Sequence, residues 1–272
     1  MWDALIMQIL NGKTNHDNLL YGRAFRHRDV NLCSQGSLGF MLMARFHVTK
    51  EFDGENCPDF RDNSSWYDIK LVVSLASGQL NEQGHVRYFK TMGITNYYNA
   101  VKDIIRSQGL VCNHYCHLGR VLGAADLQMV EMDDDHIRKL GNWGVTVIDQ
   151  SYSTKLPMTA MRAAGGYTDS NGMFYCPRST VEAPDELKKL IFPFADNQLR
   201  LVEEEVEKNG KNEGGNYLGA ARLFLRMLIR LRTIILQDAA AMFVSHPDRV
   251  MCHHFFQEFP DIFRTREFDV SF

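Results

Sequence analysis

The chain has 272 residues, 45% of them hydrophobic and 23% charged, which indicates a globular protein with enough apolar material for a sizeable core. A formal net charge of −3 excludes a protein that is basic over its whole surface, so any nucleic-acid site has to be a local patch. Residues 1–10 lack the basic start and the cleavage site of a signal peptide, and the six scattered cysteines indicate the reduced thiols of an intracellular protein.

The first predicted element is a β-hairpin with a lysine at its tip. Residues 4–10 and 18–25 are rich in aliphatic side chains, and Lys13 lies between them in the turn-forming sequence NGKTN. The densest basic cluster of the chain overlaps the second strand and its exit, and it comprises Arg23, Arg26, His27 and Arg28. A solvated surface and a phosphate-binding patch both remain open as interpretations of this cluster.

Helices are predicted for most of the remaining chain. Apolar residues at helical spacing, together with start and stop signals, predict helices over residues 36–48, 94–108, 117–128, 133–140, 158–164, 185–191, 197–208 and 217–244. The last of these is long and apolar, but its four arginines exclude a membrane span. Arg222, Arg226 and Arg230 share one face of it, and we expect them to pair with the acidic segment Glu203–Glu205.

One segment is a clear linker, the sequence NGKNEGGN at residues 209–216. We therefore expect a first domain over residues 1–208 and a C-terminal segment over residues 217–272. This segment combines the long helix with a tail that alternates aromatic and charged residues. We expect it to pack on the same domain.

Five residues of types suited to phosphate chemistry on DNA occur in the chain, in this order: Lys13, His117, Arg120, Trp143 and Tyr152. A tyrosine hydroxyl can attack a DNA phosphate and become attached to it, and a hairpin lysine can protonate the leaving oxygen. An arginine fork braces the phosphate oxygens with a two-pronged geometry that lysine lacks. The set resembles the catalytic residues of tyrosine recombinases, and this resemblance implies their phosphate pocket.

Longer motifs extend the similarity over residues 10–272. In chain order they are GKTN (12–15), FRHRDVNLC (25–33), WYDIKL (66–71), HLGR (117–120), IRKLGNW (137–143), YSTKLPMTAMRAAGGY (152–167), YCPR (175–178), LKKLIFPF (187–194) and HPDRVMCHHFFQEFPDIF (246–263). Together they resemble the second domain of the large DNA-binding subunit of the fungal centromere-binding factor complex. That domain is similar to the tyrosine recombinases of Crypton transposons.

The resemblance implies a mainly α fold with a small β-hairpin or sheet, like the catalytic domain of tyrosine recombinases, and a protein of the nucleus. It implies that the five residues of the set above occupy catalytic positions. DNA contacts are expected from Lys13, Arg23, Arg26, Arg28, Arg120, Arg138 and Lys139. The first recombinase arginine, which precedes the hairpin, has no counterpart here, so we expect the domain to be N-terminally incomplete. Losing such a contact costs on the order of 10²-fold in rate, which favours non-covalent binding of the duplex DNA backbone over cleavage.

Two other functions remain open. A Crypton-type tyrosine recombinase, truncated at its N-terminus, would cleave and join DNA strands through Tyr152. An architectural module would bind partner proteins through the aromatic tail, and the net negative charge favours this hypothesis. A second copy of the chain and other protein subunits are the alternatives considered as protein partners. The segment Cys112–His117 lacks a second ligand pair at zinc-finger spacing, so we expect no metal, and we expect no cofactor.

Overall fold

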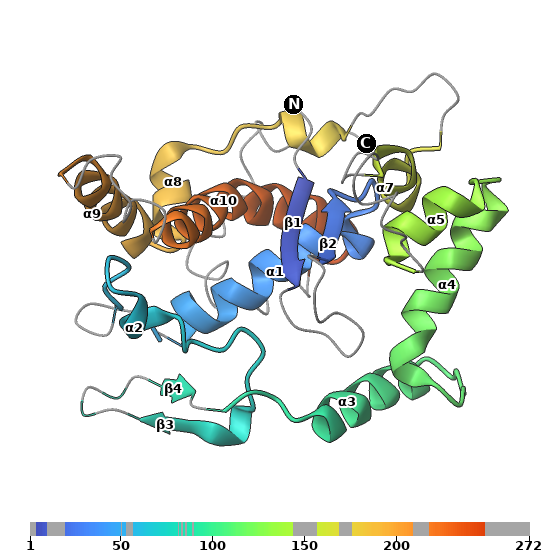
Figure 1. The fold of residues 1–272 in the computed structure, drawn as a ribbon, viewed down its shortest axis with the longest axis horizontal. Helices are drawn as coiled ribbons and strands as arrows, with labels where there is room; N and C mark the ends of the chain where they lie inside the picture. The colour runs from blue at the N-terminus through green and yellow to red at the C-terminus, as the bar shows by residue number, and fades with distance from the viewer. Residues whose placement is uncertain are drawn as a thin grey trace. The chain divides into compact units, whose positions relative to one another are not determined.

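Helices form most of the described structure, together with two small antiparallel sheets (Figure 1). The computed structural model describes residues 4–9, 20–49, 51–52, 57–80, 82, 84, 86–88, 90–143, 157–168, 176–208 and 218–247. The chain divides into unit 1, which holds residues 1–35 and 94–176, and unit 2, which holds residues 36–93 and 177–272. The predicted mainly α fold with a small hairpin is confirmed. Lys13, Tyr152, the linker and the tail after residue 247 lie outside the described residues.

The predicted N-terminal hairpin is present in unit 1. Strand β1 (Ala4–Ile9) pairs antiparallel with β2 (Leu20–Phe25), so that Ala4 lies opposite Phe25. A second hairpin, of β3 (Gly78–Leu80) and β4 (Val86–Tyr88), lies in unit 2 and was not predicted. Short elements complete the described chain: η1 (Val30–Leu32), the π-helical turn η2 (Ala44–Val48), α2 (Asn63–Trp66), η4 (Leu75–Ser77) and η5 (Pro177–Thr180).

The helices of unit 1 in the described segments are α3 (Ile94–Ser107), α4 (Tyr115–Met129), α5 (Asp134–Gly141) and α7 (Met158–Ala164). Each begins and ends within two residues of its predicted range. Helix α5 starts where the acidic sequence predicts it, because the carboxylate of Asp133 accepts a hydrogen bond from the N–H of Asp135. Helix α7 contacts β2, α4 and α5, and it buries Ala160 and Met161 among them. These contacts bring β2 and α5 into one structural unit.

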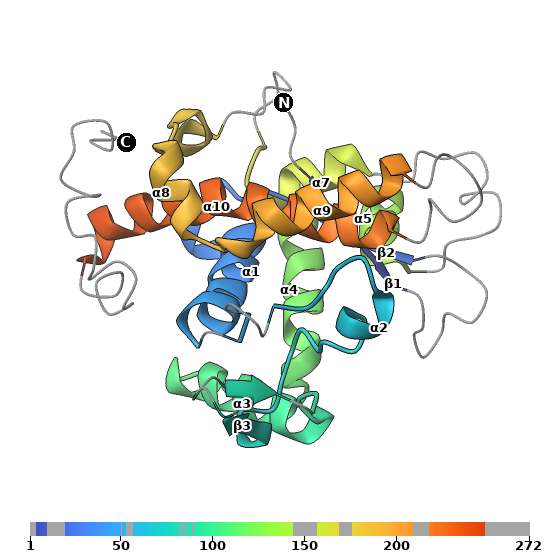
Figure 2. The ribbon, with the colours of Figure 1, turned by 90° about the vertical axis from the view of Figure 1, so that its left-hand side faces the viewer.

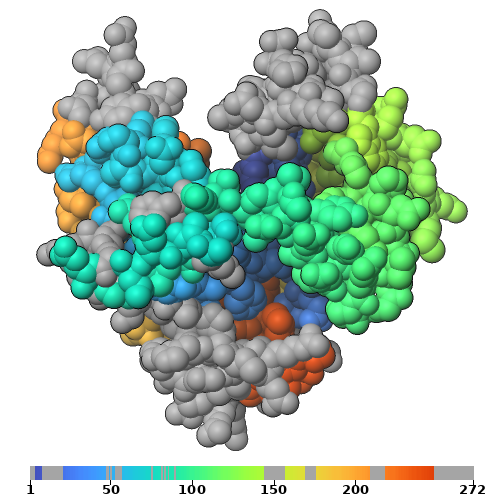
Figure 3. Space-filling model, turned by 90° about the horizontal axis from the view of Figure 1, so that it is seen from below, coloured from blue at the N-terminus to red at the C-terminus, as the bar shows by residue number. Residues whose placement is uncertain are grey.

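Helices α3 and α4 present an open surface, drawn in green in Figure 3. They contact each other, and the Nε of Arg106 donates a hydrogen bond to the hydroxyl of Tyr115 at 3.0 Å. No residue of α3 is buried, and Ile94 and Ile104 are 78% and 65% exposed. The apolar stripe that predicted this helix is therefore largely in contact with solvent.

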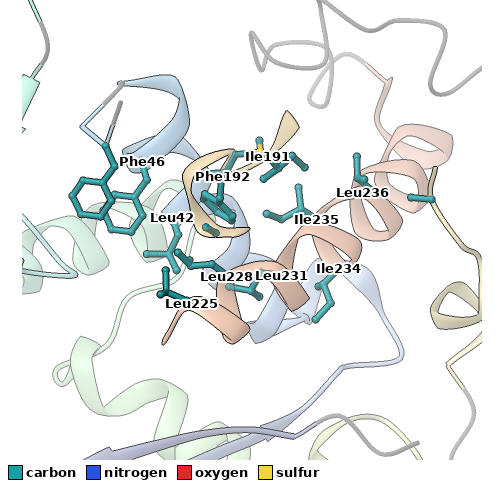
Figure 4. Packing of buried hydrophobic residues seen from close by; sticks show 14 of the residues in the cluster. Leu42, Phe46, Ile191, Phe192, Leu225, Leu228, Leu231, Ile234, Ile235 and Leu236 are labelled. Atoms are coloured by element: carbon teal, nitrogen blue, oxygen red, sulfur yellow. The ribbon is translucent and has the colours of Figure 1, made fainter. Parts of the chain in front are cut away.

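Unit 2 is built around the long helix α10 (Gly219–Ser245), which contacts α9 (Phe194–Lys208), α8 (Asp185–Leu190) and η5 (Figure 2). Helix α1 (Ser34–Met43) packs closely on α10, since a Cβ atom at Gly39 would lie 2.8 Å from Ile235. Figure 4 shows the buried apolar side chains of this core, among them Leu42, Phe46, Ile191, Phe192, Leu225, Leu228, Leu231, Ile234, Ile235 and Leu236. Each such side chain stabilises the fold by roughly 1.5–3 kcal/mol.

Buried charges of unit 2 are paired, as burial in a low-dielectric interior requires. The Nε of Arg178 lies 2.6 Å from Oδ1 of Asp238 in α10, and Arg45 forms a two-pronged ion pair with Glu51. The expected pairing of the arginine face of α10 with the acidic helix is confirmed for Arg226, which lies 2.7 Å from Glu203. In the described part of the chain, no helix combines the length and the hydropathy that crossing a membrane would require.

Candidate nucleic-acid interface

The candidate interface lies in unit 1, where β2 meets the C-terminal end of α5. Arg23 of β2 is half-buried, and its Nη1 donates a hydrogen bond to the carbonyl oxygen of Lys139 at 3.2 Å. Its guanidinium carbon lies 5.6 Å from the ring centre of Tyr21. Burial lowers the pKa of Arg23, because the charged guanidinium loses hydration there. The strand therefore holds a partly desolvated positive charge against a helix end.

A second guanidinium reaches the same helix end from α4. Arg120 is exposed, and its Nη2 donates a hydrogen bond to the carbonyl oxygen of Gly141 at 3.2 Å. Its guanidinium carbon also lies 5.1 Å from the ring centre of Trp143, within cation–π distance. Helix C-terminal carbonyls carry partial negative charge, which favours both arginines at this place. The structure thus brings together two of the predicted recombinase positions, Arg120 and Trp143, and adds Arg23 to them.

These two arginines differ from their basic neighbours in how their charge is balanced. Within the described segments, no carboxylate forms an ion pair with Arg23 or Arg120, whose hydrogen-bond acceptors are main-chain carbonyls. By contrast, Arg138 and Lys139 of α5 both pair with Asp135, at 3.0 Å and 2.6 Å. Arg138 and Lys139 were predicted as DNA contacts, and the structure places both in ion pairs on α5.

The predicted basic cluster after β2 is held by the turn that ends α7. The N–H of Arg28 donates a hydrogen bond to the carbonyl of Gly165 at 2.8 Å. Gly166 has a φ of +84°, and a Cβ atom there would lie 3.3 Å from Cε1 of His27. Arg28 is exposed, whereas the Arg26 side chain is only 3% exposed. The cluster therefore splits into a surface cation and a buried one.

His117, the remaining described member of the predicted catalytic set, lies in the first turn of α4 and is exposed. The main-chain N–H of His117 donates a hydrogen bond to the main-chain carbonyl of His114 at 2.9 Å, and the two imidazole ring centres lie 6.4 Å apart. Arg120 follows three residues later, so the two side chains project from the same face of the helix. Across the described residues, no group of three or more His, Cys, Asp and Glu side chains is arranged to hold a metal ion.

A family model of the second domain of the CBF3 subunit of the centromere DNA-binding protein complex matches residues 1–269. The chain belongs to this family. The motifs predicted this family, and that prediction is confirmed, whereas the similarity to Crypton recombinases stays a prediction. Searches among curated proteins and among solved structures found no significant match.

Membership in the CBF3 subunit domain 2 family supports DNA binding within a protein complex. Gly141 and Asn142 bond Arg120 and β2, respectively, and were predicted only as the end of a helix. They belong to the motif IRKLGNW, in which Arg138, Lys139 and Trp143 were the predicted site residues. An asparagine directly after a helix is a known signal for a left-handed helix end, and this signal could have pointed to Asn142.

Proposed function

We propose that this CBF3 domain 2 family member binds duplex DNA in the nucleus through the sugar–phosphate backbone, without cutting it, on a tyrosine-recombinase-like fold. The observation that carries the proposal is the meeting of Arg23 and Arg120 at the C-terminal end of α5, with no carboxylate partner in the described segments. Membership in the family supports DNA as the ligand, and it supports other subunits of a complex as protein partners.

The chemistry of the two guanidinium groups favours a phosphate ligand. Each guanidinium has five N–H donors in a planar fork, and one hydrogen bond from each is directed at an α5 carbonyl. Other donors of the fork are available for the paired oxygens of a phosphate group. A phosphate would also compensate the desolvation that lowers the pKa of Arg23. Arg28, which is exposed, and Lys13 are further proposed contacts.

Backbone contacts position a protein on DNA but carry little sequence information. We therefore expect weak sequence preference and an affinity that falls steeply with salt, because bound cations release counterions from the duplex. The pairing of Arg138 and Lys139 with Asp135 predicts a smaller part for these two side chains. The burial of Arg26 predicts an indirect part for that residue.

The test is fluorescence anisotropy of a labelled short duplex over a series of potassium chloride concentrations. Arg23→Ala and Arg120→Ala should each weaken binding and lower the salt slope by roughly 0.9, the value for one lost phosphate contact. Arg138→Ala is the matched control, since its side chain lies on α5 but is paired with Asp135. Equal affinities for all three variants and the parent protein would refute the proposal.

The second candidate function is strand cleavage by a Crypton-type recombinase through Tyr152. The contact between Arg120 and Trp143 favours it, because both are expected around a recombinase phosphate. A suicide DNA substrate would trap a covalent adduct in the parent protein, and Tyr152→Phe would abolish that adduct. Failure to form any adduct under conditions of saturated binding would exclude cleavage.

A further inference from the structure

We propose that Gly141 and Asn142 are positioning residues that set the geometry of Arg23 and Arg120. DNA affinity then depends on two residues that need not touch DNA. This inference rests on the proposed function. It assigns to the end of α5 a role beyond capping a helix, namely to hold two cations from different elements at one helix end.

Asn142 connects the helix end to the strand that carries Arg23. It adopts a left-handed conformation, with φ 53° and ψ 41°, and its N–H donates to the carbonyl of Arg138. Its side-chain Nδ2 donates a hydrogen bond to the carbonyl of Tyr21 at 3.0 Å. Tyr21 lies two residues before Arg23, and its ring faces the Arg23 guanidinium. The amide of Asn142 therefore holds β2 at the place from which Arg23 reaches α5.

The left-handed turn also determines which carbonyls remain for the arginines. The N–H groups of Asn142 and Trp143 both donate to the carbonyl of Arg138. The carbonyls of Lys139 and Gly141 then accept from Arg23 and Arg120, respectively. Since the last carbonyls of a helix have no partner within the helix, the turn offers them to side chains from outside. The two guanidinium groups are in this way directed to acceptors two residues apart at the same helix end.

Gly141 sets the position of the second arginine through Trp143. A Cβ atom at Gly141 would lie 2.8 Å from both Cδ2 and Cε3 of the Trp143 ring. An alanine there would push the indole aside, and the indole is the surface on which the Arg120 guanidinium rests. Glycine at this position therefore leaves room for the indole to lie across the helix end.

The test compares variants that separate backbone conformation from side-chain bonding. Asn142→Gly retains easy access to the left-handed conformation but removes the amide that bonds Tyr21. We expect DNA binding about fivefold weaker, the change that corresponds to one hydrogen bond of about 1 kcal/mol. Gly141→Ala should also weaken binding, although alanine favours helix formation. A merely structural role of Gly141 would move the melting temperature and leave the salt slope unchanged.

A double-mutant cycle distinguishes positioning from general destabilisation. If Asn142 acts through the arginines, Asn142→Gly should weaken binding in the parent protein but change little in the Arg23→Ala, Arg120→Ala background. An equal loss in both backgrounds would overturn the inference while leaving the proposed function intact. If the arginine variants themselves bind DNA like the parent, the proposed function fails, and this inference fails with it. Should Gly141→Ala not fold, the cycle with Asn142→Gly still decides the question.

Discussion

The buried ion pair between Arg178 and Asp238 allows the sharpest test of the fold. Arg178→Met keeps the length of the side chain but removes the guanidinium that lies 2.6 Å from the carboxylate. Asp238 is 0% exposed and Arg178 is 3% exposed, so the remaining carboxylate would be buried without this partner. Breaking such a pair from one side costs about 3–5 kcal/mol. For a chain of this size the melting temperature should fall by roughly 6–20 °C.

The measurement is urea unfolding followed by far-UV circular dichroism, with thermal melting as a second readout. Arg178→Met combined with Asp238→Asn is the matched control, because the double variant leaves neither charge buried and unpaired. We expect it to be more stable than Arg178→Met alone. A Cβ atom at Gly36 would collide with Oδ2 of Asp238, so this carboxylate also adjoins the start of α1. A loss below about 1 kcal/mol in Arg178→Met, or no recovery in the double variant, would refute the reasoning.

Three further outcomes follow from particular residues. Gly166→Ala should destabilise unit 1 by about 1–2 kcal/mol in thermal melting, because the left-handed backbone and the nearby His27 ring both oppose a Cβ atom; an unchanged melting temperature would contradict this. Burial raises the pKa of Glu51 above its ordinary value of 4.5, so the folded state favours the protonated carboxyl group. The stability gained from this preference is complete below pH 4.5 and is lost as pH rises through the raised pKa. Between pH 4.5 and the raised pKa, the unfolding free energy of the parent protein should therefore decline with pH relative to that of Glu51→Gln. Parallel curves of unfolding free energy against pH for the two proteins would contradict this prediction. Burial also raises the pKa of the Cys57 thiol to about 11, so iodoacetamide should label the exposed Cys116 faster at neutral pH; mass spectrometry showing equal labelling would refute this.

The helices were predictable where periodicity and end signals agreed. The range 158–164 was predicted to the residue, and Gly109, with a φ of +76°, directly follows the helix predicted over residues 94–108. The hairpin of β3 and β4 left no comparable signal. Its strands have three residues each, and all three residues of β3 are exposed, so no alternation of apolar and polar side chains marks them.

The candidate site was predictable residue by residue but not as an arrangement. Arg23 and Arg120 were each expected to contact phosphates, yet nothing in the sequence indicated that both would donate to the same helix end. Main-chain carbonyls accept these hydrogen bonds. Because every residue has a main-chain carbonyl, the residue types in the sequence do not indicate which carbonyl accepts. Arg26 shows the converse difficulty, because a run of basic residues does not reveal which side chain is buried.

The net charge of −3 and a DNA-binding function become compatible when the ion pairs are considered one by one. Many cations of the chain are balanced locally, as in the pairs Arg61–Asp59, Lys188–Asp185, Arg200–Glu204 and Arg226–Glu203. Such pairs contribute little field at a distance, whatever their number. The guanidinium groups of Arg23 and Arg120 rest instead on carbonyl oxygens and aromatic rings. Positive potential at one place therefore requires no excess of basic residues, since it depends on which cations the fold keeps away from carboxylates.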